Sequence, residues 1–577
     1  MKIKHFVIPV ALLLCMSCSH RLKDGDYTLT ILSTNDVHST WFDSTYTDGR
    51  IKRSIFAMNY YIDSVRTADG FDNVLLIDAG DCLQGDNAAY YFNYVDTVTP
   101  HLFPRLISYM QYDAIAMGNH DIETGHPVYD RVQRDLVKAG VPFMAGNAIR
   151  DDNGQPYCPL YKVVHKAGLK IAILGYNNAN IKAWLSEEIW SGMHFESIAR
   201  QVQQDVDYVR EKEHPDVMIT AMHSACGQGD GSVLEAEALD VFNSVKGVDW
   251  VICGHDHRPY VEARDSSALL NSGSHSRFVA HGKMQLTVEK GQIVSKSFEA
   301  DLIPVKAEKA DPVMRAHFQK DFEAVRDFTL QEVGVLNMDL RTRDAYIGMS
   351  DYLNLIHSIC LQQKPAQLSI AAPLTYNGEI PSGILRYNDL FTIYPFENQL
   401  FVINMTGQEI VDYLEASYDR WIQDGKDHVL KIVPRDNPRN QQIGWSFTGQ
   451  AYNFDSVAGL NYTVDVTRPR GERIHVSSLA DGSPFRLDQT YPVAVTSYRA
   501  SGGGGLLDEI GIDTDRIEER TVARYPEIRN LIYDYLMENG SIDPEVVGDP
   551  AVIGQWKFVP EKEQARLKAD LKLLFKD

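Results

Sequence analysis

Short apolar runs recur along the first half of the chain, and a polar loop and a helical pattern follow most of them. The runs lie at residues 29–32, 74–77, 114–117, 170–174, 217–220 and 250–253. Apolar runs of this length are typical of strands that are buried on both faces of a sheet. Because helical stretches at 132–139 and 198–213 separate them, the pattern predicts an α/β fold whose sheet faces are mostly covered.

The pattern changes after residue 302. Residues 312–331 are charged, helical in period and poor in turn residues, which predicts a connecting helix. Strands of a second domain are expected near 400–403, 462–466 and 493–495. A chain of 577 residues is too long for one hydrophobic core. We therefore expect a first domain, a linker helix, a second domain and a C-terminal tail, at residues 25–305, 306–332, 333–540 and 541–577.

The first residues have the pattern of an export signal. Lys2 and Lys4 precede an apolar stretch at 6–16 that is too short to span a bilayer comfortably. The sequence Ser-Cys-Ser around Cys18 resembles a bacterial lipoprotein cleavage site. We therefore expect residues 1–18 to be a signal peptide and Cys18 to carry a lipid, which would place the protein in the periplasm or at the outer membrane. Plain secretion is the alternative, and the lipid is the only membrane contact that we expect.

The net charge restricts the class of substrate. Lys and Arg total 56 against 78 Asp and Glu, a formal net charge of -22. This balance argues against a nucleic-acid polymer as partner, because such binding needs a basic surface. A small anionic substrate remains compatible, since bound dications can reverse the sign of the local field.

The cysteines give no sign of a disulfide framework. Five remain after Cys18, an odd and widely spaced set: Cys82, Cys158, Cys226, Cys253 and Cys360. Packing is therefore expected to provide the stability of the fold.

Five polar motifs stand at the ends of the apolar runs. They are Asn35-Asp36-Val37-His38, Asp78-Ala79-Gly80-Asp81, Gly118-Asn119-His120-Asp121, Met222-His223 and Gly254-His255-Asp256-His257. A single Asp after a strand is usually a helix cap or a turn residue. Five strand ends in order, each with ligands that borderline divalent ions prefer, predict a two-metal centre instead.

The expected ligand set mixes nitrogen and oxygen atoms. The ligands are Asp36, His38, Asp81, Asn119, His223, His255 and His257. One residue separates Asp36 from His38, and His255 from His257, so on extended segments each pair points to one side. Asp81 is the natural bridging carboxylate. This set suits Zn, Mn, Fe or Co rather than Ca, and we expect two divalent ions, Zn or Mn.

Such a centre supports phosphoester hydrolysis. Two ions lower the pKa of a shared water and hold phosphoryl oxygens for in-line attack on phosphorus. His120 is expected to act as an acid or a charge stabiliser, with Asp121 orienting its imidazole. Cys226 is either a soft ligand or a small buried residue, and we favour the second interpretation. Asp78 is expected to be a hydrogen-bond acceptor beside the ligands.

These motifs resemble those of the 5'-nucleotidase family of metallophosphoesterases, over nearly the whole mature chain. The resemblance implies that one ion is held by Asp36, His38, Asp81 and His257, and the other by Asp81, Asn119, His223 and His255. It also implies that His120 and Asp121 form the catalytic dyad. The implied fold is a four-layered α/β (calcineurin-like) metallophosphoesterase domain, joined by a helix to an α+β 5'-nucleotidase C-terminal domain that binds substrate.

In this family the second domain clamps the nucleobase between two aromatic rings. The corresponding segments point to Tyr498 on one side and Phe454 on the other, with Tyr452 as the competing choice. The structural alternative is that these aromatics fill the core. Arg499 would either contribute charge near the substrate or be solvated.

Two departures from the family pattern bear on the substrate. Gly504 stands where an Asp usually binds ribose hydroxyls, and the usual Asn-x-Gly-Gly-Ile-Arg loop is missing. Loss of that carboxylate removes a repulsion against a phosphate esterified to the ribose. We therefore expect an exported hydrolase that leans to 2',3'-cyclic-nucleotide phosphodiesterase and 3'-nucleotidase activity in nucleotide salvage. The alternatives are a 5'-nucleotidase or UDP-sugar hydrolase, and a non-catalytic nucleotide-binding protein.

Overall fold

The computed structural model describes residues 22–423, 427–436 and 443–575. Two six-stranded sheets form the centre of the first domain. The first sheet contains, in spatial order, β14 (Gln292–Pro304), β13 (Phe278–Glu289), β1 (Gly25–Thr34), β2 (Val74–Asp78), β3 (Ala114–Ala116) and β4 (Phe143–Met144). The second contains β11 (Tyr260–Ala263), β12 (Ala268–Asn271), β10 (Trp250–Ile252), β9 (Val217–Met222), β7 (Leu169–Tyr176) and β6 (Tyr161–Lys166).

The two sheets pack face to face, and helices cover their outer faces. One buried cluster joins residues of both sheets, including Leu29 and Leu75 of the first with Ile171 and Ile219 of the second. The outer layers are α1 (Ile55–Asp69), α3 (Leu102–Met110) and α5 (His126–Lys138) on one side, and α6 (Ile198–Glu213) and α7 (Ala238–Ser244) on the other. The expected four-layered α/β domain is therefore confirmed.

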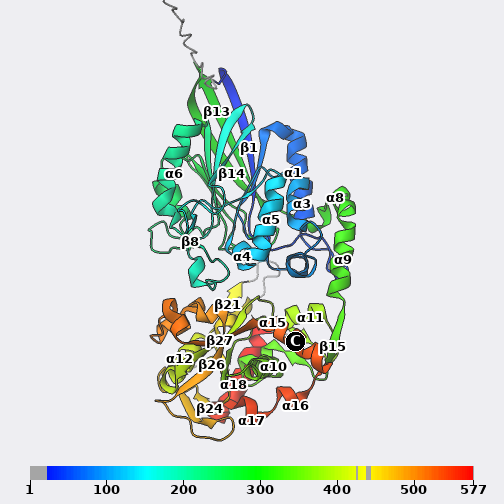
Figure 1. The fold of residues 1–577 in the computed structure, drawn as a ribbon, viewed down its shortest axis with the longest axis vertical. Coiled ribbons are helices and arrows are strands. Elements are labelled where there is room, and N and C mark those ends of the chain that lie inside the picture. The colour runs from blue at the N-terminus through cyan, green and yellow to red at the C-terminus, as the bar shows by residue number, and fades with distance from the viewer. Residues whose placement is uncertain (1–21, 424–426, 437–442, 576–577) are drawn as a thin grey trace, which may run out of the picture.

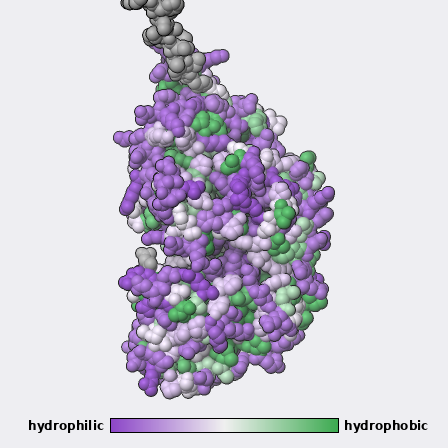
Figure 2. Space-filling view, viewed as in Figure 1, coloured by the Kyte–Doolittle hydropathy of each residue, from purple (hydrophilic) through white to green (hydrophobic). Residues whose placement is uncertain are grey.

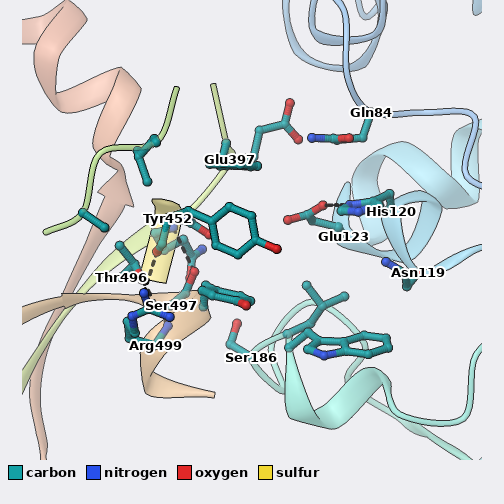
Figure 3. Close-up of a pocket in the computed structure, with 18 of the residues that line it drawn as sticks. Gln84, Asn119, His120, Glu123, Ser186, Glu397, Tyr452, Thr496, Ser497 and Arg499 are labelled. Carbon is teal, nitrogen blue, oxygen red and sulfur yellow. Dashed lines mark hydrogen bonds and ion pairs between the residues drawn. The ribbon is translucent and has the colours of Figure 1, made fainter. Parts of the chain in front are cut away.

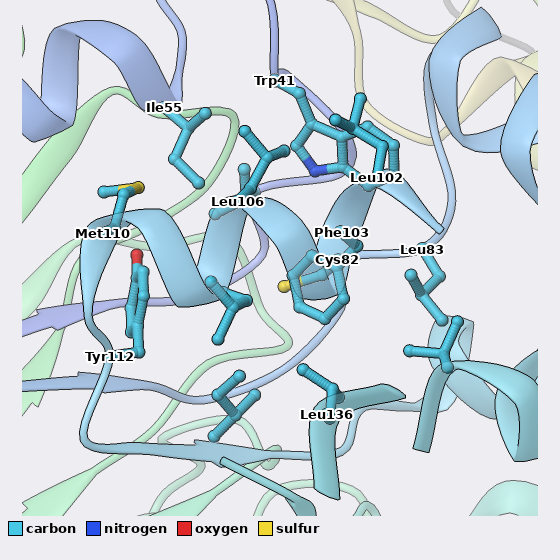
Figure 4. Packing of buried hydrophobic residues seen from close by; sticks show 14 of the residues in the cluster. Trp41, Ile55, Cys82, Leu83, Leu102, Phe103, Leu106, Met110, Tyr112 and Leu136 are labelled. Carbon is cyan, nitrogen blue, oxygen red and sulfur yellow. The ribbon is translucent and has the colours of Figure 1, made fainter. Parts of the chain in front are cut away.

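Local sequence explains these elements. All five residues of β2 are buried, as expected for an apolar run inside a parallel sheet. In α6 the buried residues Ile198, Val202, Val206 and Val209 recur at helical spacing. Figure 4 shows the corresponding packing under α3, where Phe103 and Leu106 lie close to Trp41 and Ile55.

Two short helices form the linker, where one was expected over 312–331. They are α8 (Pro312–His317) and α9 (Gln319–Thr329), and they run along one side of the molecule between the two domains (Figure 1). Phe318 lies at the break, buried against Phe56 at a ring-centroid distance of 6.2 Å. A pair between Arg105 and Asp321, at 2.6 Å, attaches α9 to the first domain.

The second domain is built on a five-stranded mixed sheet. Its spatial order is β23 (Ser456–Ala458), β17 (Leu368–Ala371), β26 (Thr490–Thr496), β20 (Gln399–Thr406) and β27 (Thr521–Glu527). The strands expected near 400–403 and 493–495 are β20 and β26, and the one near 462–466 is β24 (Leu460–Asp465). The main helices are α10 (Asp351–Gln362), α12 (Gly407–Trp421) and α15 (Ile528–Asn539).

The residues after 540 are part of this domain, which corrects the expectation of a separate tail. The strand β29 (Gly554–Val559) pairs in parallel with β24 over six residues. The helix α18 (Gln564–Leu574) follows it, and Phe575 stacks on Tyr346 in the core of the domain at 5.8 Å. The apolar residues of this segment therefore complete the second core.

The predicted signal peptide and the lipid site at Cys18 lie outside the described residues. In the part of the chain that the structure describes, no helix has the length and apolar character needed to cross a bilayer. The face shown in Figure 2 is mostly hydrophilic, with apolar residues scattered over it.

Candidate functional site

The five polar motifs meet at one edge of the two sheets. In the first sheet β1, β2 and β3 are neighbouring parallel strands, and in the second β9 and β10 are. Each of these strands ends one to five residues before an expected metal ligand. Because carboxyl ends of parallel strands share an edge, the folding of the two sheets brings the ligands together.

One group of side chains joins the first and last motifs. Asp36, His38 and His257 each place a ligand atom within 4.8 Å of the other two. The Nε2 atoms of His38 and His257 are 2.9 Å apart, and Nε2 of His257 is 3.4 Å from Oδ1 of Asp36. This arrangement could hold one ion.

A second group adjoins the first. Asp81, His223 and His255 also lie with their ligand atoms within 4.8 Å of one another. Nε2 of His223 is 2.9 Å from Oδ2 of Asp81 and 3.9 Å from Oδ1 of Asp36, so the two groups are in contact. Oδ1 of Asn119 lies 3.0 Å from Nδ1 of His255, within hydrogen-bond distance. All seven expected ligands therefore gather here.

The residues fit a pair of divalent ions. Oδ1 of Asp36 and Nε2 of His223 are buried, and neither makes a hydrogen bond of good geometry, although each lies within 3.5 Å of a polar side-chain atom of another ligand. Buried polar atoms normally make such a hydrogen bond, so these two atoms are placed as if for a ligand. Burial lowers the pKa of His38 to about 3 and that of His255 to about 4, which leaves both imidazoles neutral, the form that binds metals.

The backbone of the ligands is unusual. Five of the seven have positive φ values: Asp36 (47°), His38 (45°), Asp81 (62°), His255 (79°) and His257 (59°). Non-glycine residues rarely adopt this conformation, which carries strain and is concentrated at functional sites. The strand ends are thus bent sharply so that the ligand side chains turn toward one another.

A glycine makes room for the centre. Gly118 precedes Asn119, and a Cβ atom on it would lie 2.2 Å from Oδ1 of Asp81. Only glycine therefore permits the loop after β3 to approach the Asp81 carboxylate this closely.

His120 is paired with Glu123, one helical turn further along α4 (Asn119–Glu123). Nδ1 of His120 and Oε2 of Glu123 form a hydrogen bond. Burial lowers the pKa of His120, but the carboxylates of Glu123 and Asp81 raise it by more, to about 10. The imidazole is therefore protonated at neutral pH and its Nε2–H is available to a substrate.

Asp121 does not orient His120, which corrects the expected dyad. Its carboxylate instead accepts hydrogen bonds from the backbone N–H groups of Asp81, Cys82, Leu83 and Gly118, at 2.8 to 3.1 Å. These bonds tie the loop after β2 to the loop after β3. Asp121 therefore shapes the site through the backbone.

A cavity of roughly 490 Å³ connects the metal-ligand groups with the second domain. Asn119, His120 and His255 line one end, and Tyr452 and Tyr498 line the other. Figure 3 shows the Tyr452 hydroxyl pointing across the cavity toward Glu123 and His120. Both domains therefore contribute walls to one pocket, and the ligand edge of the first domain opens into it.

Comparison with known proteins agrees with this geometry. Residues 29–259 match the family model of calcineurin-like phosphoesterases, and residues 331–509 match that of the 5'-nucleotidase C-terminal domain. The chain belongs to the 5'-nucleotidase family of metallophosphoesterases. The calcineurin-like domain is a phosphoesterase domain, so the protein is a phosphoric ester hydrolase. Domains of this family use divalent metal ions.

Individual relatives of this metallophosphoesterase are distant. A trifunctional nucleotide phosphoesterase protein of Bacillus subtilis is 22% identical over 90% of this chain, which spans 38% of that protein. A 2',3'-cyclic-nucleotide 2'-phosphodiesterase/3'-nucleotidase of Haemophilus influenzae is 24% identical over 93% of this chain and 88% of its own length. A solved Staphylococcus aureus structure assigned as a 5'-nucleotidase, in complex with alpha-ketoglutarate, superposes with a TM-score of 0.74 at 21% identity, covering 92% of this chain and 99% of that one. The last comparison supports the fold.

The aromatic wall of the phosphoesterase pocket differs from the favoured expectation. Tyr498 and Tyr452 line the cavity, with ring centroids 6.4 Å apart and planes at 83°. Phe454, the favoured partner of Tyr498, is fully buried and packs on Trp421 and Phe447 at about 5 Å. Phe454 is therefore a core residue, and the competing choice, Tyr452, occupies the pocket.

Arg499 lines the cavity, as one of the two expectations had it, but it is buried rather than solvated. Its Nε donates to Asp455 at 2.9 Å, and its terminal nitrogens donate to the backbone oxygens of Gly503 and Tyr452. Its charge is therefore used to hold the glycine loop against the segment that carries Tyr452.

In this backbone, an aspartate at position 504 would require the side chains of Asn453 and Arg499 to move. The φ of Gly504 is 75°, and a Cβ atom would lie 2.4 Å from Oδ1 of Asn453 and 2.5 Å from a terminal nitrogen of Arg499. The loop is thus built around a residue without a side chain.

Several pocket residues escaped the sequence interpretation. Glu123 could have been found, because it follows His120 at the i, i+3 spacing of helix neighbours. Trp184, whose ring centroid is 5.2 Å from that of His255, and Glu397, which faces the cavity near Gln84 (Figure 3), carried no motif.

Asp78 agrees with expectation, because it accepts hydrogen bonds from the Thr34 hydroxyl and the Gly80 backbone. Cys226 lies outside both ligand groups, but it is partly exposed rather than buried, and its sulfur contacts that of Cys253.

Proposed function

We propose that this protein is an exported two-metal phosphohydrolase that acts on nucleotides, preferring 2',3'-cyclic and 3'-phosphorylated ones, and that it releases nucleosides for salvage. The observation that carries the proposal is the single cavity that runs from the metal-ligand groups to the Tyr452 and Tyr498 rings. A phosphate at one end and a base at the other fit such a pocket. Relatives named as nucleotidases and as a cyclic-nucleotide phosphodiesterase support it.

The residues of the chain would divide the work as follows. Asp36, His38, Asp81 and His257 would hold one divalent ion, and Asp81, Asn119, His223 and His255 would hold the other. When bound, Zn or Mn ions supply Lewis-acid activation of water and of the phosphoryl group. Protonated His120, kept so by Glu123, would donate a hydrogen bond to a phosphoryl or leaving oxygen and neutralise charge that develops there.

The preference for a ribose-bound phosphate rests on the second domain. With glycine at 504, no carboxylate stands where the resemblance places the aspartate that binds ribose hydroxyls. An aspartate at this position would be strained at a φ of 75° and would displace the side chains of Asn453 and Arg499. Tyr452 and Tyr498 present two π surfaces for a base at the far end of the cavity.

A substrate panel tests the proposal. Turnover of 2',3'-cyclic AMP, 3'-AMP, 5'-AMP and a UDP-sugar would be measured side by side on the metal-loaded protein. We expect the first two to have the highest kcat/KM. If 5'-AMP or the UDP-sugar is hydrolysed far faster, the protein is a 5'-nucleotidase or a nucleotide-sugar hydrolase and the interpretation of Gly504 is wrong.

The remaining alternative is a nucleotide receptor without activity. The complete ligand set argues against it, because a degraded centre would have lost ligands. His120→Ala should retain bound metal and lose about 10²–10⁴-fold in turnover. Binding of all four nucleotides with turnover of none by the metal-loaded wild-type protein would favour the receptor.

A further inference from the structure

A pair of thiols lies beside the metal-ligand groups. The sulfur atoms of Cys226 and Cys253 are 3.8 Å apart. Both cysteines are free, and neither belongs to the groups that could hold a metal ion. Sulfur atoms at this distance are in van der Waals contact. A disulfide bond is about 2 Å long, so the two sulfur atoms must move closer by a little less than that length to form one.

The two cysteines belong to neighbouring strand ends that carry expected ligands. Cys226 follows His223 by three residues, in the loop after β9, and Cys253 follows β10 directly, two residues before His255. The strands β9 and β10 are paired in parallel. A bond between the sulfurs would therefore join the two loops that supply nitrogen atoms to the same ligand group.

Access to the two sulfurs differs. Cys253 is completely buried, whereas Cys226 is partly exposed. A reagent from solvent can therefore reach Cys226 first, and Cys253 is reached through Cys226. The side-chain nitrogen of Asn271 lies 3.9 Å from the Cys226 sulfur, as a donor, and also donates to Asp256, which holds the Cys226 loop in place.

We propose that Cys226 and Cys253 form an oxidisable dithiol, which a disulfide-containing oxidant converts into a cross-link between the loops of His223 and His255. The oxidising surroundings expected for an exported protein favour such a bond. The cross-link does not depend on which phosphate ester the protein hydrolyses.

The reaction is two successive thiol–disulfide exchanges. The Cys226 thiolate attacks one sulfur of the oxidant, the oxidant's S–S bond breaks, and the released thiolate takes up the proton that Cys226 lost. The Cys253 thiolate then attacks the Cys226 sulfur of the mixed disulfide and releases the second oxidant thiol, which takes up the Cys253 proton. Two protein thiols are oxidised to one disulfide, and one oxidant disulfide is reduced to two thiols.

Peptide mapping of the mature, metal-loaded protein tests this proposal. The protein is incubated with oxidised glutathione, denatured, alkylated at its remaining thiols, digested and measured by mass spectrometry. We expect the Cys226 and Cys253 peptides to be joined and lighter by two hydrogen atoms. The other cysteines should be found alkylated.

Variants separate the two exchange steps. Cys253→Ser should stop the reaction at a mixed disulfide between glutathione and Cys226, whereas the control Cys158→Ser, at another buried cysteine, should still form the cross-link. The proposal is overturned if the wild-type protein keeps both thiols free, or if it accumulates the glutathione adduct on Cys226 without the cross-link. Both of these outcomes concern the unmodified sequence, so misfolding of a variant cannot obscure them.

Discussion

At the scale of single residues, the acid–base chemistry rests on an imidazole held by a carboxylate one helical turn away. Burial alone would keep His120 neutral, and Glu123 together with Asp81 reverses that effect by raising the pKa to about 10. The acid form of His120 is therefore fully present at neutral pH and is lost only as the pH rises through the raised pKa.

The variant Glu123→Gln tests this arrangement. Without the Glu123 carboxylate the pKa of His120 falls, so the alkaline limb of the pH profile of kcat/KM should move to lower pH. The maximum of kcat/KM should drop by up to about 10²-fold, the lower end of what acid–base groups contribute. Steady-state kinetics across pH measures both effects.

Asp121→Ala is the matched variant on the same short helix. Because Asp121 accepts four backbone N–H groups, its loss should lower the Tm by destabilising the two loops. If Asp121→Ala shifted the alkaline limb and Glu123→Gln did not, the sequence-based dyad would be right and the pairing with Glu123 irrelevant.

At the scale of elements, a short 3-10 helix sorts two aromatic residues into different environments. The helix η6 (Ala451–Asn453) contains Tyr452, which is 36% exposed and lines the cavity. Phe454 follows the helix directly and is 0% exposed. Two residues apart, they face a pocket and a core. The tight turn of this helix directs the Tyr452 side chain into the pocket and the Phe454 side chain into the core.

Substitution of these two residues should have opposite consequences. Tyr452→Ala should raise KM about tenfold, since stacking on a base contributes roughly 1–3 kcal/mol, and leave the Tm nearly unchanged. Phe454→Ala should lower the Tm strongly by opening a cavity in the core, at a cost of about 3–5 kcal/mol. Kinetics and thermal unfolding of both variants would measure this; a KM effect confined to Phe454→Ala would contradict the assignment.

The glycine loop gives a second element-scale prediction. Gly504→Asp introduces a Cβ atom where Asn453 and Arg499 leave no space, at a φ of 75°. We expect a lower Tm and no gain in 5'-AMP turnover. A stable variant with increased 5'-AMP turnover would show that the loop can adapt and that residue 504 alone sets the preference.

Sequence patterns were most informative about elements that are buried throughout. The strands before Asp36, Asp81 and His255 could be predicted because a strand in a covered parallel sheet is buried on both faces, so its residues form an uninterrupted apolar run. The pairing of His120 with Glu123 could also have been predicted, from the i, i+3 spacing of the two residues, but it was missed. The orientation of Tyr452 could not be predicted, since it depends on a single helical turn. Glu397 was also beyond prediction, because it reaches the cavity through the packing of the second domain.

At the scale of the whole molecule, the pocket exists only where the two domains meet. The first domain supplies the metal-ligand groups and His120, and the second supplies the aromatic wall. The α/β first domain was predicted correctly, the expected single linker helix is two short helices, and the segment after residue 540 was mistaken for a tail. The apolar residues of this segment are spread over one strand and one helix, which gives no clear pattern in the sequence. Their partners, β24 and the core around Tyr346, are identified by the structure.

Removal of the metal ions should affect the whole first domain. Chelation should abolish turnover and lower the Tm, because bound ions stabilise only the folded state and offset the repulsion between the buried Asp36 and Asp81 carboxylates. Turnover and thermal unfolding would be measured before chelation, after it, and after addition of Zn or Mn. Full activity of the chelated protein, with no metal left by elemental analysis, would exclude a metal-dependent reaction.

The left-handed backbone at the ligands has a consequence for evolution and for engineering. At Asp36, His38 or His257, glycine would relieve the strain of a positive φ, so the substitution that suits the backbone best is one that deletes a ligand. A library of variants selected for thermal stability in the absence of metal should therefore accumulate glycine at these positions. Such variants would lose metal ligands and, with them, catalytic activity. Selection with metal present would favour the variants that keep these ligands, because bound metal stabilises them. The availability of metal is therefore what retains the strained residues in the sequence.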